Sequence, residues 1–398
     1  MKAFTDKRIN DANHEVTIAV IGAGLMGRLT ALELHRCGYH VTLIDKDNKD
    51  GKASSAYAAA GLLTPLGEAL HADTSIVEMG LEALTLWPSI LSSLDEHVFF
   101  QQAGALMVSH EQDKGDYERH QRFLFRYFKH HNIQALDRQQ LLELEPELGR
   151  NFQRGLYLPP EGQLGNRRLL IALKKQLERE QVPWLSECEV TNIFPHGTSN
   201  SPDKTVIEYQ KRSSNKQLPN KKLAVDLAID CRGVGACLNP RGTKKTNSAM
   251  QIADLRAIRG ELFQLYAPHV HLHRPVRLMH PRYQLYIAPK PRGYFVVGAT
   301  EIESDDMSPM TVRSAMELLS AAYSVHPGLA EANIRQHVSH CRPAFSDNQP
   351  KISSQPGIIQ VNGLYRHGFL IAPVILQQIK QAVNNACSQS NQQMEHFR

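Results

Sequence analysis

The sequence lacks any uninterrupted apolar run of the length that a membrane-spanning helix requires. Its six cysteines form no CxxC pair and have no histidine at zinc-finger spacing. Nothing in the first residues resembles a secretion signal. We therefore expect a protein of the reducing cytoplasm without an integral membrane segment.

Charge of one sign is not concentrated anywhere in the chain. Lys and Arg number 45 against 40 Asp and Glu, and the basic residues are spread without a dominant block. Such a balance supports solubility and gives little support for nucleic-acid binding. No repeat of solenoid or propeller period is visible. With 398 residues of ordinary globular composition, the chain is long enough for two domains, each with a core.

The chain does contain a strand, a glycine-rich turn and a helix near its start. Val16–Ile21 reads VTIAVI, a β-branched run typical of a buried parallel strand, and it leads into GAGLMG. Leu25–Cys37 has the apolar spacing of a helix, and Val41–Ile44 follows as a second strand. The pattern predicts a βαβ unit.

Each glycine of this motif has its own physical task. Gly22 allows the tight turn, Gly24 lets the backbone approach a pyrophosphate, and Gly27 lets the helix pack closely on the strand. The helix N-terminus then directs free N–H groups at the anion. Asp45 ends the second strand, where an acidic side chain accepts hydrogen bonds from a ribose. The sequence therefore predicts a binding site for an adenine dinucleotide.

Small residues dominate the next segment, in which Ser54 and Ser55 precede AYAAAGLLTP (Ala56–Pro65). By composition alone this segment is typical of an alanine-rich helix start. A backbone that lies flat against a large planar ligand also needs small side chains and a glycine, here Gly61. The position of the segment after a dinucleotide motif favours this second interpretation, and FAD over NAD.

Together these motifs resemble the FAD-dependent amine oxidoreductases of the D-amino-acid oxidase superfamily. Within it, the sequence is most similar to the glycine oxidases of thiamine biosynthesis. Further similar motifs occur in the family's order along almost the whole chain: GALMVSH (Gly104–His110), LYLPPEGQLGNRRLL (Leu156–Leu170), IRGELF (Ile258–Phe263), LYIAPKPRGYFVVGATE (Leu285–Glu301), CRPAFSDNQPKI (Cys341–Ile352) and GLYRHGFLIAP (Gly363–Pro373).

The resemblance implies an α/β plus α+β fold, in which an antiparallel-sheet substrate domain is inserted into a Rossmann-like FAD-binding domain. We expect the FAD-binding domain at residues 1–95, 158–247 and 337–398, and the substrate domain at 96–157 and 248–336. Read independently, the sequence predicts substrate-sheet strands at Ala105–Val108, Ala257–Leu265, Gln284–Ile287 and Tyr294–Gly298. It predicts amphipathic helices at Ser75–Leu91, Asp113–Lys129, Asn166–Glu180 and Met310–Tyr323.

Two further segments connect these elements. Leu223–Gly235 is expected to be a buried strand that enters a glycine turn beneath the cofactor, although Cys231 and Arg232 replace the smaller residues usual in the family. His196–Lys222, rich in Ser, Asn, Pro and Lys, is expected to be a solvent-exposed hairpin insertion.

An arginine stands in an apolar run near the C-terminus. Arg366 is followed closely by Gly368, Phe369 and Leu370, and a buried guanidinium requires an anion beside it. The resemblance implies that the anion is the substrate carboxylate. It also implies that the last helix, expected at about Ala372–Ala386, directs its positive end at the flavin pyrimidine ring.

The resemblance also assigns Arg342 of CRPAF as the main carboxylate clamp and Tyr286 of LYIAPK as a hydroxyl donor to the same carboxylate. A planar guanidinium can hold a carboxylate through two hydrogen bonds. Without the resemblance, Arg342 would be typical of an exposed extended segment and Tyr286 of a sheet tyrosine. The expected FAD contacts are Gly22, Ala23, Gly24, Leu25, Met26, Gly27, Asp45, Lys46, Ser54, Ser55, Ala60, Gly61, Leu62, Val190, Gly233, Arg366, His367, Gly368, Phe369 and Leu370.

Three further features are interpreted without a catalytic role. The alternating His269, His271 and His273 could bind a metal from one face of a strand, but no carboxylate or cysteine stands near them in the sequence, so we expect no metal. Cys231 and Cys237 are expected to be buried thiols. Gln284 occupies a position where the family's glycine oxidases can carry a pocket histidine, which leaves substrate selectivity open.

The activity implied is oxidation of glycine or a similar small amine to the imine, with O2 reduced to H2O2, in support of thiamine thiazole formation. Two alternatives remain open: a D-amino-acid dehydrogenase that passes electrons to a quinone, and a non-catalytic FAD-binding assembly protein. The expected partners are a small amine and O2. Relatives form dimers or tetramers, and the sequence leaves the oligomeric state open.

Overall fold

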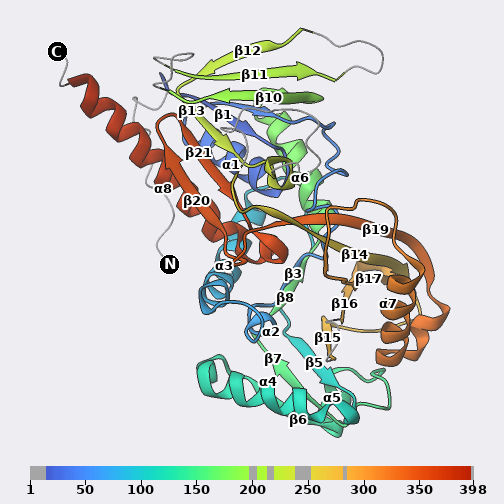
Figure 1. Ribbon diagram of the computed structural model, residues 1–398. Helices are drawn as coiled ribbons and strands as arrows, with labels where there is room; N and C mark the ends of the chain where they lie inside the picture. The colour runs from blue at the N-terminus through green and yellow to red at the C-terminus, as the bar shows by residue number, and fades with distance from the viewer. Residues whose placement is uncertain (1–14, 197–203, 213–218, 238–251, 281–284, 396–398) are drawn as a thin grey trace.

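The computed structural model of the chain describes residues 15–196, 204–212, 219–237, 252–280 and 285–395 (Figure 1). Its first strand, β1 (Thr17–Ile21), is buried on both faces, as its β-branched and small side chains predict. Ile18 and Val20 belong to a core shared with helices, whereas Ala19 and Ile21 belong to a second core on the opposite face. The strand is therefore covered on both sides.

β1 lies in a six-stranded sheet with the order β20-β21-β13-β1-β2-β9. The pairs from β21 to β9 are parallel, and β20 is antiparallel to β21. The other strands are β2 (His40–Ile44), β9 (Trp184–Leu185), β13 (Leu227–Asp230), β20 (Lys351–Gln355) and β21 (Ile358–Asn362).

Helices and a small sheet cover the two faces of this parallel sheet (Figure 1). The helices are α1 (Leu25–Arg36), α3 (Thr74–Ser92), α6 (Asn166–Arg179) and α8 (Gly368–Glu395). Trp87 of α3 is fully buried, and its indole N–H donates to the Phe369 carbonyl of α8 at 3.0 Å. The opposite face carries β10 (Cys188–Phe194), β11 (Thr205–Lys211) and β12 (Lys221–Val225).

A second, nine-stranded sheet has the order β18-β14-β17-β16-β15-β5-β7-β6, with β19 paired to β14. Its pairs are antiparallel apart from β15 with β5. The strands are β5 (Ala105–Ser109), β6 (Gln134–Asp137), β7 (Arg154–Leu158), β14 (Arg256–Tyr266), β15 (Val276–Met279), β16 (Leu285–Lys290), β17 (Tyr294–Gly298), β18 (Ile302–Glu303) and β19 (Asn333–Ala344).

The remaining α-helices and one short sheet complete the described part of the structure. α4 (Lys114–Tyr127), α5 (Arg138–Leu144) and α7 (Val312–Val325) lie near the nine-stranded sheet (Figure 1). β3 (Leu62–Leu63), β8 (Gly162–Leu164) and β4 (Phe100–Gln101) form a three-stranded sheet, and the short α2 (Pro65–Glu68) follows β3.

The fold class matches the predicted one, and most of the predicted helices and strands occur within a few residues of their expected bounds. The largest difference is the last helix, expected at about Ala372–Ala386, whereas α8 begins at Gly368 and continues to Glu395. Gln284 lies outside the described residues. The domain bounds given above stay a proposal.

Two predictions for the middle of the chain are wrong in part. Leu223–Gly235 is not one strand: β12 ends before Asp226, whose carboxylate accepts hydrogen bonds from the Thr17 backbone and hydroxyl at 2.9 and 2.6 Å. Asp226 thus marks the point where the chain passes from one sheet to the other. His196–Lys222 is not exposed throughout, because Ile207 of β11 is fully buried.

Candidate active site

One cavity of about 2140 Å³ runs from the carboxyl ends of β1 and β2 to the nine-stranded sheet. This volume exceeds the roughly 300–1,000 Å³ typical of a site for one small molecule. It therefore has room for a dinucleotide and a second ligand. Apart from Gly27, the predicted site residues line it: Gly22, Ala23, Gly24, Leu25, Met26, Asp45, Lys46, Ser54, Ser55, Ala60, Gly61, Leu62, Val190, Gly233, Tyr286, Arg342, Arg366, His367, Gly368, Phe369 and Leu370.

The three glycines of the first turn have the geometry predicted for them. Gly22 has a φ of +97°, and a Cβ there would lie 2.7 Å from the Cys231 carbonyl oxygen. A Cβ on Gly24 would meet nothing within 4 Å, so this backbone is open to the cavity. A Cβ on Gly27 would lie 1.7 Å from the Gly22 carbonyl oxygen, which is why this glycine packs against the turn and does not line the cavity.

The N-terminus of α1 is suited to an anion. Gly24 caps the helix without a side-chain hydrogen bond, and the first turn has no acidic residue. Its N–H groups are therefore available to a phosphate. Asp45 accepts hydrogen bonds from the backbone N–H groups of Ala23 and, at 2.7 Å, Asp47, and burial raises the pKa of its carboxyl. Its contact with a ribose stays a prediction.

Arg28 of α1 stabilises the backbone around the glycine turn. It is 1% exposed and donates to the carbonyls of Ala23, Leu170 and Lys49 at 2.8, 2.7 and 3.2 Å. Burial lowers its pKa to about 10. Arg28 and Lys49 also lie against the Trp184 ring, 5.0 and 5.4 Å from its centroid. These contacts tie the glycine turn, α6 and the chain after β2 together.

The alanine-rich segment after Ser55 is not helical, which agrees with the interpretation preferred from its position. Residues 56–59 form turns before β3. The Asn166 amide donates to the carbonyls of Ala56 and Ala59 at 2.9 and 2.7 Å. Gly61 has a φ of +67°, and a Cβ there would lie 2.4 Å from the Leu164 carbonyl oxygen. The small side chains of Ala58, Ala59 and Ala60 line the cavity.

At the nine-stranded sheet, Arg342 and Tyr286 each lie across a glycine of the neighbouring strand. A Cβ on Gly260 of β14 would lie 2.2 Å from Arg342 Nη2, and a Cβ on Gly298 of β17 would lie 2.7 Å from the Tyr286 hydroxyl oxygen. Burial raises the Tyr286 pKa, which keeps the hydroxyl protonated. The glycines thus give both side chains room to lie over the sheet.

Arg342 has few partners of its own. Its Nη1 donates to the Thr300 carbonyl at 3.2 Å. Within the part of the chain that the structure describes, no carboxylate lies within ion-pair distance of it. A guanidinium that lines a cavity without an anion has unused donors, which suit an incoming carboxylate.

Comparison with known proteins agrees with this geometry. The profile of the DAO family, described as FAD dependent oxidoreductase, matches residues 17–378. The chain belongs to this family. It is therefore an FAD-dependent oxidoreductase, and FAD is its cofactor.

Individual relatives cover nearly the whole chain. A Rhizobium etli protein named for an inferred role as the thiamine biosynthesis oxidoreductase ThiO is 32% identical over 362 residues, covering 91% of this chain and 94% of the relative. The glycine oxidase of Geobacillus kaustophilus is 23% identical over 370 residues, covering 91% of each chain. Its crystal structure has a TM-score of 0.77 at 21% identity, covering 93% of this chain and 95% of the other. The predicted fold class, a Rossmann-like domain with an inserted substrate domain, is confirmed.

The residues of the cavity fit FAD. The open backbone at Gly24 and the uncapped α1 would hold the pyrophosphate, and the residues near Ala59 would lie against the flavin ring. α8 begins at Gly368, where a Cβ would meet nothing within 4 Å, so its N-terminal turn also faces the cavity. Burial lowers the His367 pKa to about 4, so its imidazole is neutral at pH 7 and contributes no charge there.

The partner of Arg366 differs from the one expected. Its Nη2 lies 2.5 Å from Glu68 Oε2, and its Nη1 donates to Glu301 Oε2 at 2.9 Å. Burial would lower the Arg366 pKa, but these carboxylates outweigh burial and raise it. The anion required by this buried guanidinium is thus supplied within the chain, and a contact with the substrate stays a prediction.

Sequence reasoning missed Glu68, Arg277 and Glu301. Glu68 is also paired with Arg277 of β15, whose Nη1 donates to the Gly67 carbonyl at 2.8 Å. Burial would raise the Glu68 pKa, but Arg277 and Arg366 outweigh it and hold the pKa well below its usual range. An arginine in the apolar strand VRLM carries the same signal of a buried guanidinium that singled out Arg366, and it could have revealed this cluster.

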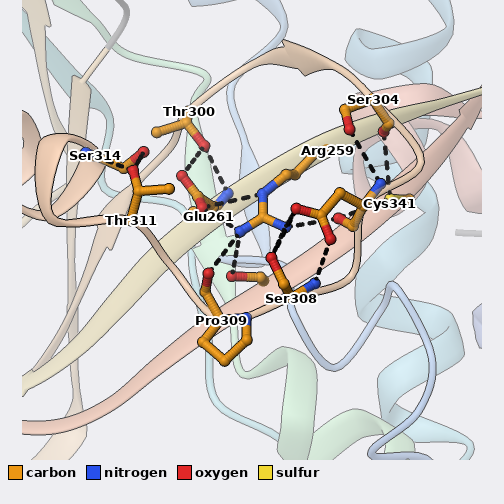
Figure 2. Close-up of polar contacts among 11 residues, drawn as sticks. Arg259, Glu261, Thr300, Ser304, Ser308, Pro309, Thr311, Ser314 and Cys341 are labelled. Carbon is orange, nitrogen blue, oxygen red and sulfur yellow. Dashed lines mark hydrogen bonds and ion pairs between the residues drawn. The ribbon is translucent and has the colours of Figure 1, made fainter.

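A second buried network holds the segment between β17 and α7 (Figure 2). Residues of this segment form one wall of the cavity. Arg259 of β14 pairs with Glu261 at 2.6 Å and donates to the carbonyls of Asp306 and Pro309 at 2.7 and 3.0 Å. The Thr300 hydroxyl donates to Glu261 Oε2 at 3.0 Å. Because the Thr300 carbonyl accepts from Arg342, this network also supports the position of that side chain.

The structure also gives an account of the remaining sequence features. Arg232 folds back on Asp230 through two hydrogen bonds, 2.8 and 2.7 Å, and leaves Gly233 to line the cavity. The six cysteines are thiols without disulfide bonds. Cys231 and Cys237 were expected to be buried, but both are only partly buried, because each packs at the margin of a hydrophobic core.

The histidine segment is not a strand, and carboxylates that are distant in the sequence lie beside it. His271 pairs with Glu147 at 2.9 Å and His273 with Glu145 at 3.1 Å, because α5 and its following loop lie beside this segment. In the described ranges, no group of three such side chains is placed to hold a metal ion. No helix of the described part is long and apolar enough to cross a membrane.

Proposed function

We propose that the chain oxidises glycine, or a similar small amine or amino acid, to the imine while O2 is reduced to H2O2, in support of thiazole formation in thiamine biosynthesis. One C–H and one N–H bond of the amine are lost, and the two protons and two electrons that are released pass to O2, which becomes H2O2. FAD supplies the hydride acceptor for this reaction. We also propose a cytoplasmic location.

The observation that carries the proposal is the uncompensated Arg342 in the cavity that fits FAD. Its free donors suit a single carboxylate, and the Tyr286 hydroxyl, kept protonated by burial, can donate to the same group. A carboxylate held there would fix the amine-bearing carbon relative to the cofactor, and positioning is the main demand of this chemistry. Similarity to the Geobacillus kaustophilus glycine oxidase supports the choice of glycine, and similarity to the Rhizobium etli protein supports a role in thiamine biosynthesis.

The test is anaerobic mixing of the FAD-loaded protein with glycine, sarcosine and short D-amino acids. Loss of the yellow flavin absorbance with a small amine is the expected result. A flavin that stays oxidised with every amine would contradict both the oxidase and the dehydrogenase function and would leave the non-catalytic alternative. After bleaching, rapid recolouring in air supports an oxidase, and recolouring only with a quinone supports a dehydrogenase.

Replacement of Arg342 by alanine should raise KM for the amine on the order of 100-fold, because charge-assisted hydrogen bonds to the carboxylate are lost. FAD content should stay the same. Arg335→Ala is the matched control, since Arg335 lies exposed on the same strand and stacks on Tyr266 outside the cavity. Normal kinetics of Arg342→Ala would remove this residue from the site.

A further inference from the structure

The positive and negative charges of the side chains grouped around Arg366 in the cavity are unequal in number. Arg277, Arg342 and Arg366 line it, together with Glu68 and Glu301. Glu68 pairs with Arg277 and Arg366, and Glu301 pairs with Arg366. Three guanidinium groups and two carboxylates leave one positive charge, and it lies on Arg342. The set can therefore accept one carboxylate without excess charge.

Glu301 is the carboxylate of this set that faces incoming ligands. Its side chain is 52% exposed, against 11% for Glu68. It directly follows Thr300, whose carbonyl accepts from Arg342, and it also takes a hydrogen bond from Tyr365. The Arg259 network fixes this loop (Figure 2). Glu301 is thus held beside Arg342 at the open side of the cluster.

We propose that Glu301 makes the site selective for amines that carry a single carboxylate. A ligand whose first carboxylate binds Arg342 would bring a second one toward Glu301 and Arg366. Glu301 repels that second carboxylate, and it also occupies Nη1 of Arg366, the nearby cation that the second carboxylate would need. The inference rests on the proposed function, because it takes Arg342 as the carboxylate clamp.

The first experiment uses ligands that do not react. Acetate and malonate differ by one carboxylate, and their binding to the FAD-loaded protein is measured from changes in the flavin absorption spectrum. Wild-type protein should bind acetate more tightly than malonate. Glu301→Gln should shift the ratio of the two Kd values toward malonate by roughly tenfold or more, because a like charge is removed and Nη1 of Arg366 loses its charged partner.

Glu303→Gln is the matched control. It removes the same charge two residues further along the chain, in β18, but its side chain is 70% exposed, pairs with Arg256 at 3.3 Å and does not line the cavity. Its Kd ratio should equal that of the wild type. An unchanged ratio in Glu301→Gln, or wild-type protein that binds malonate as tightly as acetate or binds neither, would overturn the proposal.

A second experiment uses turnover of sarcosine and iminodiacetate, two N-substituted glycines that differ by one carboxylate. Glu301→Gln should raise kcat/KM for iminodiacetate relative to sarcosine, and Glu303→Gln should not. Absence of turnover in the wild type would contradict the proposed function alone, since the acetate and malonate titrations need no reaction. The two failures are therefore distinguishable.

Discussion

Arg342 and Arg366 lie in one cavity but differ in the charges around them. Arg366 has two carboxylates within the chain, whereas Arg342 has a single carbonyl. A guanidinium that is already paired offers little to a substrate, and one that is not paired offers a charge and several donors. The positions of Glu68 and Glu301 thus explain why Arg366 is paired within the chain and Arg342 is available to a ligand.

A third acidic residue of this region, Glu161, gives a prediction about pH. It is 1% exposed, its carboxyl accepts the Gly67 N–H at 2.6 Å, and burial raises its pKa to about 8. Between its ordinary pKa and about 8, the folded protein holds a proton that the unfolded chain releases, so stability falls as pH rises through this window. Each unit of this separation corresponds to about 1.4 kcal/mol.

Glu161→Gln should therefore melt close to wild type at pH 5 and several degrees higher at pH 9, because an amide resembles the neutral acid and never ionises. The measurement is the difference in Tm between variant and wild type across this range. Glu143→Gln, an exposed change, should give a difference that is flat with pH. A flat difference for Glu161→Gln would contradict the prediction.

Neighbouring strands of the nine-stranded sheet shape the part of the cavity in which we propose that the substrate binds. Gly260 and Gly298 remove side chains where Arg342 and Tyr286 cross from neighbouring strands. Glycine inside a strand lowers strand stability, so its presence here is best explained by this close approach.

Gly260→Ala should therefore act through Arg342. The added Cβ would lie 2.2 Å from Nη2 and force the guanidinium away, so KM for the amine should rise at least tenfold, by loss of a charged hydrogen bond, while FAD binding is kept. Steady-state kinetics and FAD content are the measurements. Gly115→Ala, where a Cβ meets nothing within 4 Å, should behave as wild type. A normal KM in Gly260→Ala would contradict this account.

The elements themselves were largely predictable from the sequence. Apolar periodicity and the glycine motif gave β1, α1, β2 and the helices, since these signals are local. The break at Asp226 was not predictable, because it depends on Thr17, which is far away in sequence. The partners of Arg366 were missed for the same reason: Glu68 belongs to another part of the chain, and only the fold brings the two together.

At the scale of the whole molecule, the cavity that FAD would occupy is lined by residues of both the parallel sheet and the nine-stranded sheet. A ligand that binds the folded state alone stabilises it by mass action, by about 2.7 kcal/mol at 100 times its Kd. Removal of FAD should therefore lower Tm, and added FAD should restore it in a concentration-dependent manner.

Thermal scans of apoprotein with increasing FAD test this prediction. FMN is the matched ligand, because it lacks the AMP half, whose phosphate the Gly24 turn and whose ribose Asp45 would bind, and it should stabilise far less than FAD. Equal Tm values with and without FAD would contradict the assignment of the cavity. Equal stabilisation by FMN and FAD would contradict the role of the glycine turn.

The chain has two tryptophans, and both lie next to segments that line the cavity. The Trp87 indole is bonded to Phe369 in the first turn of α8, and Trp184 lies against Arg28 and Lys49 behind the glycine turn. Excited indole passes its energy to a nearby flavin, so the ultraviolet emission of the unlabelled protein reports whether the cofactor is present. Replacement of either tryptophan leaves a single fluorescent indole at a known position. Binding of the cofactor can then be followed separately from a position beside α8 and from one beside α1.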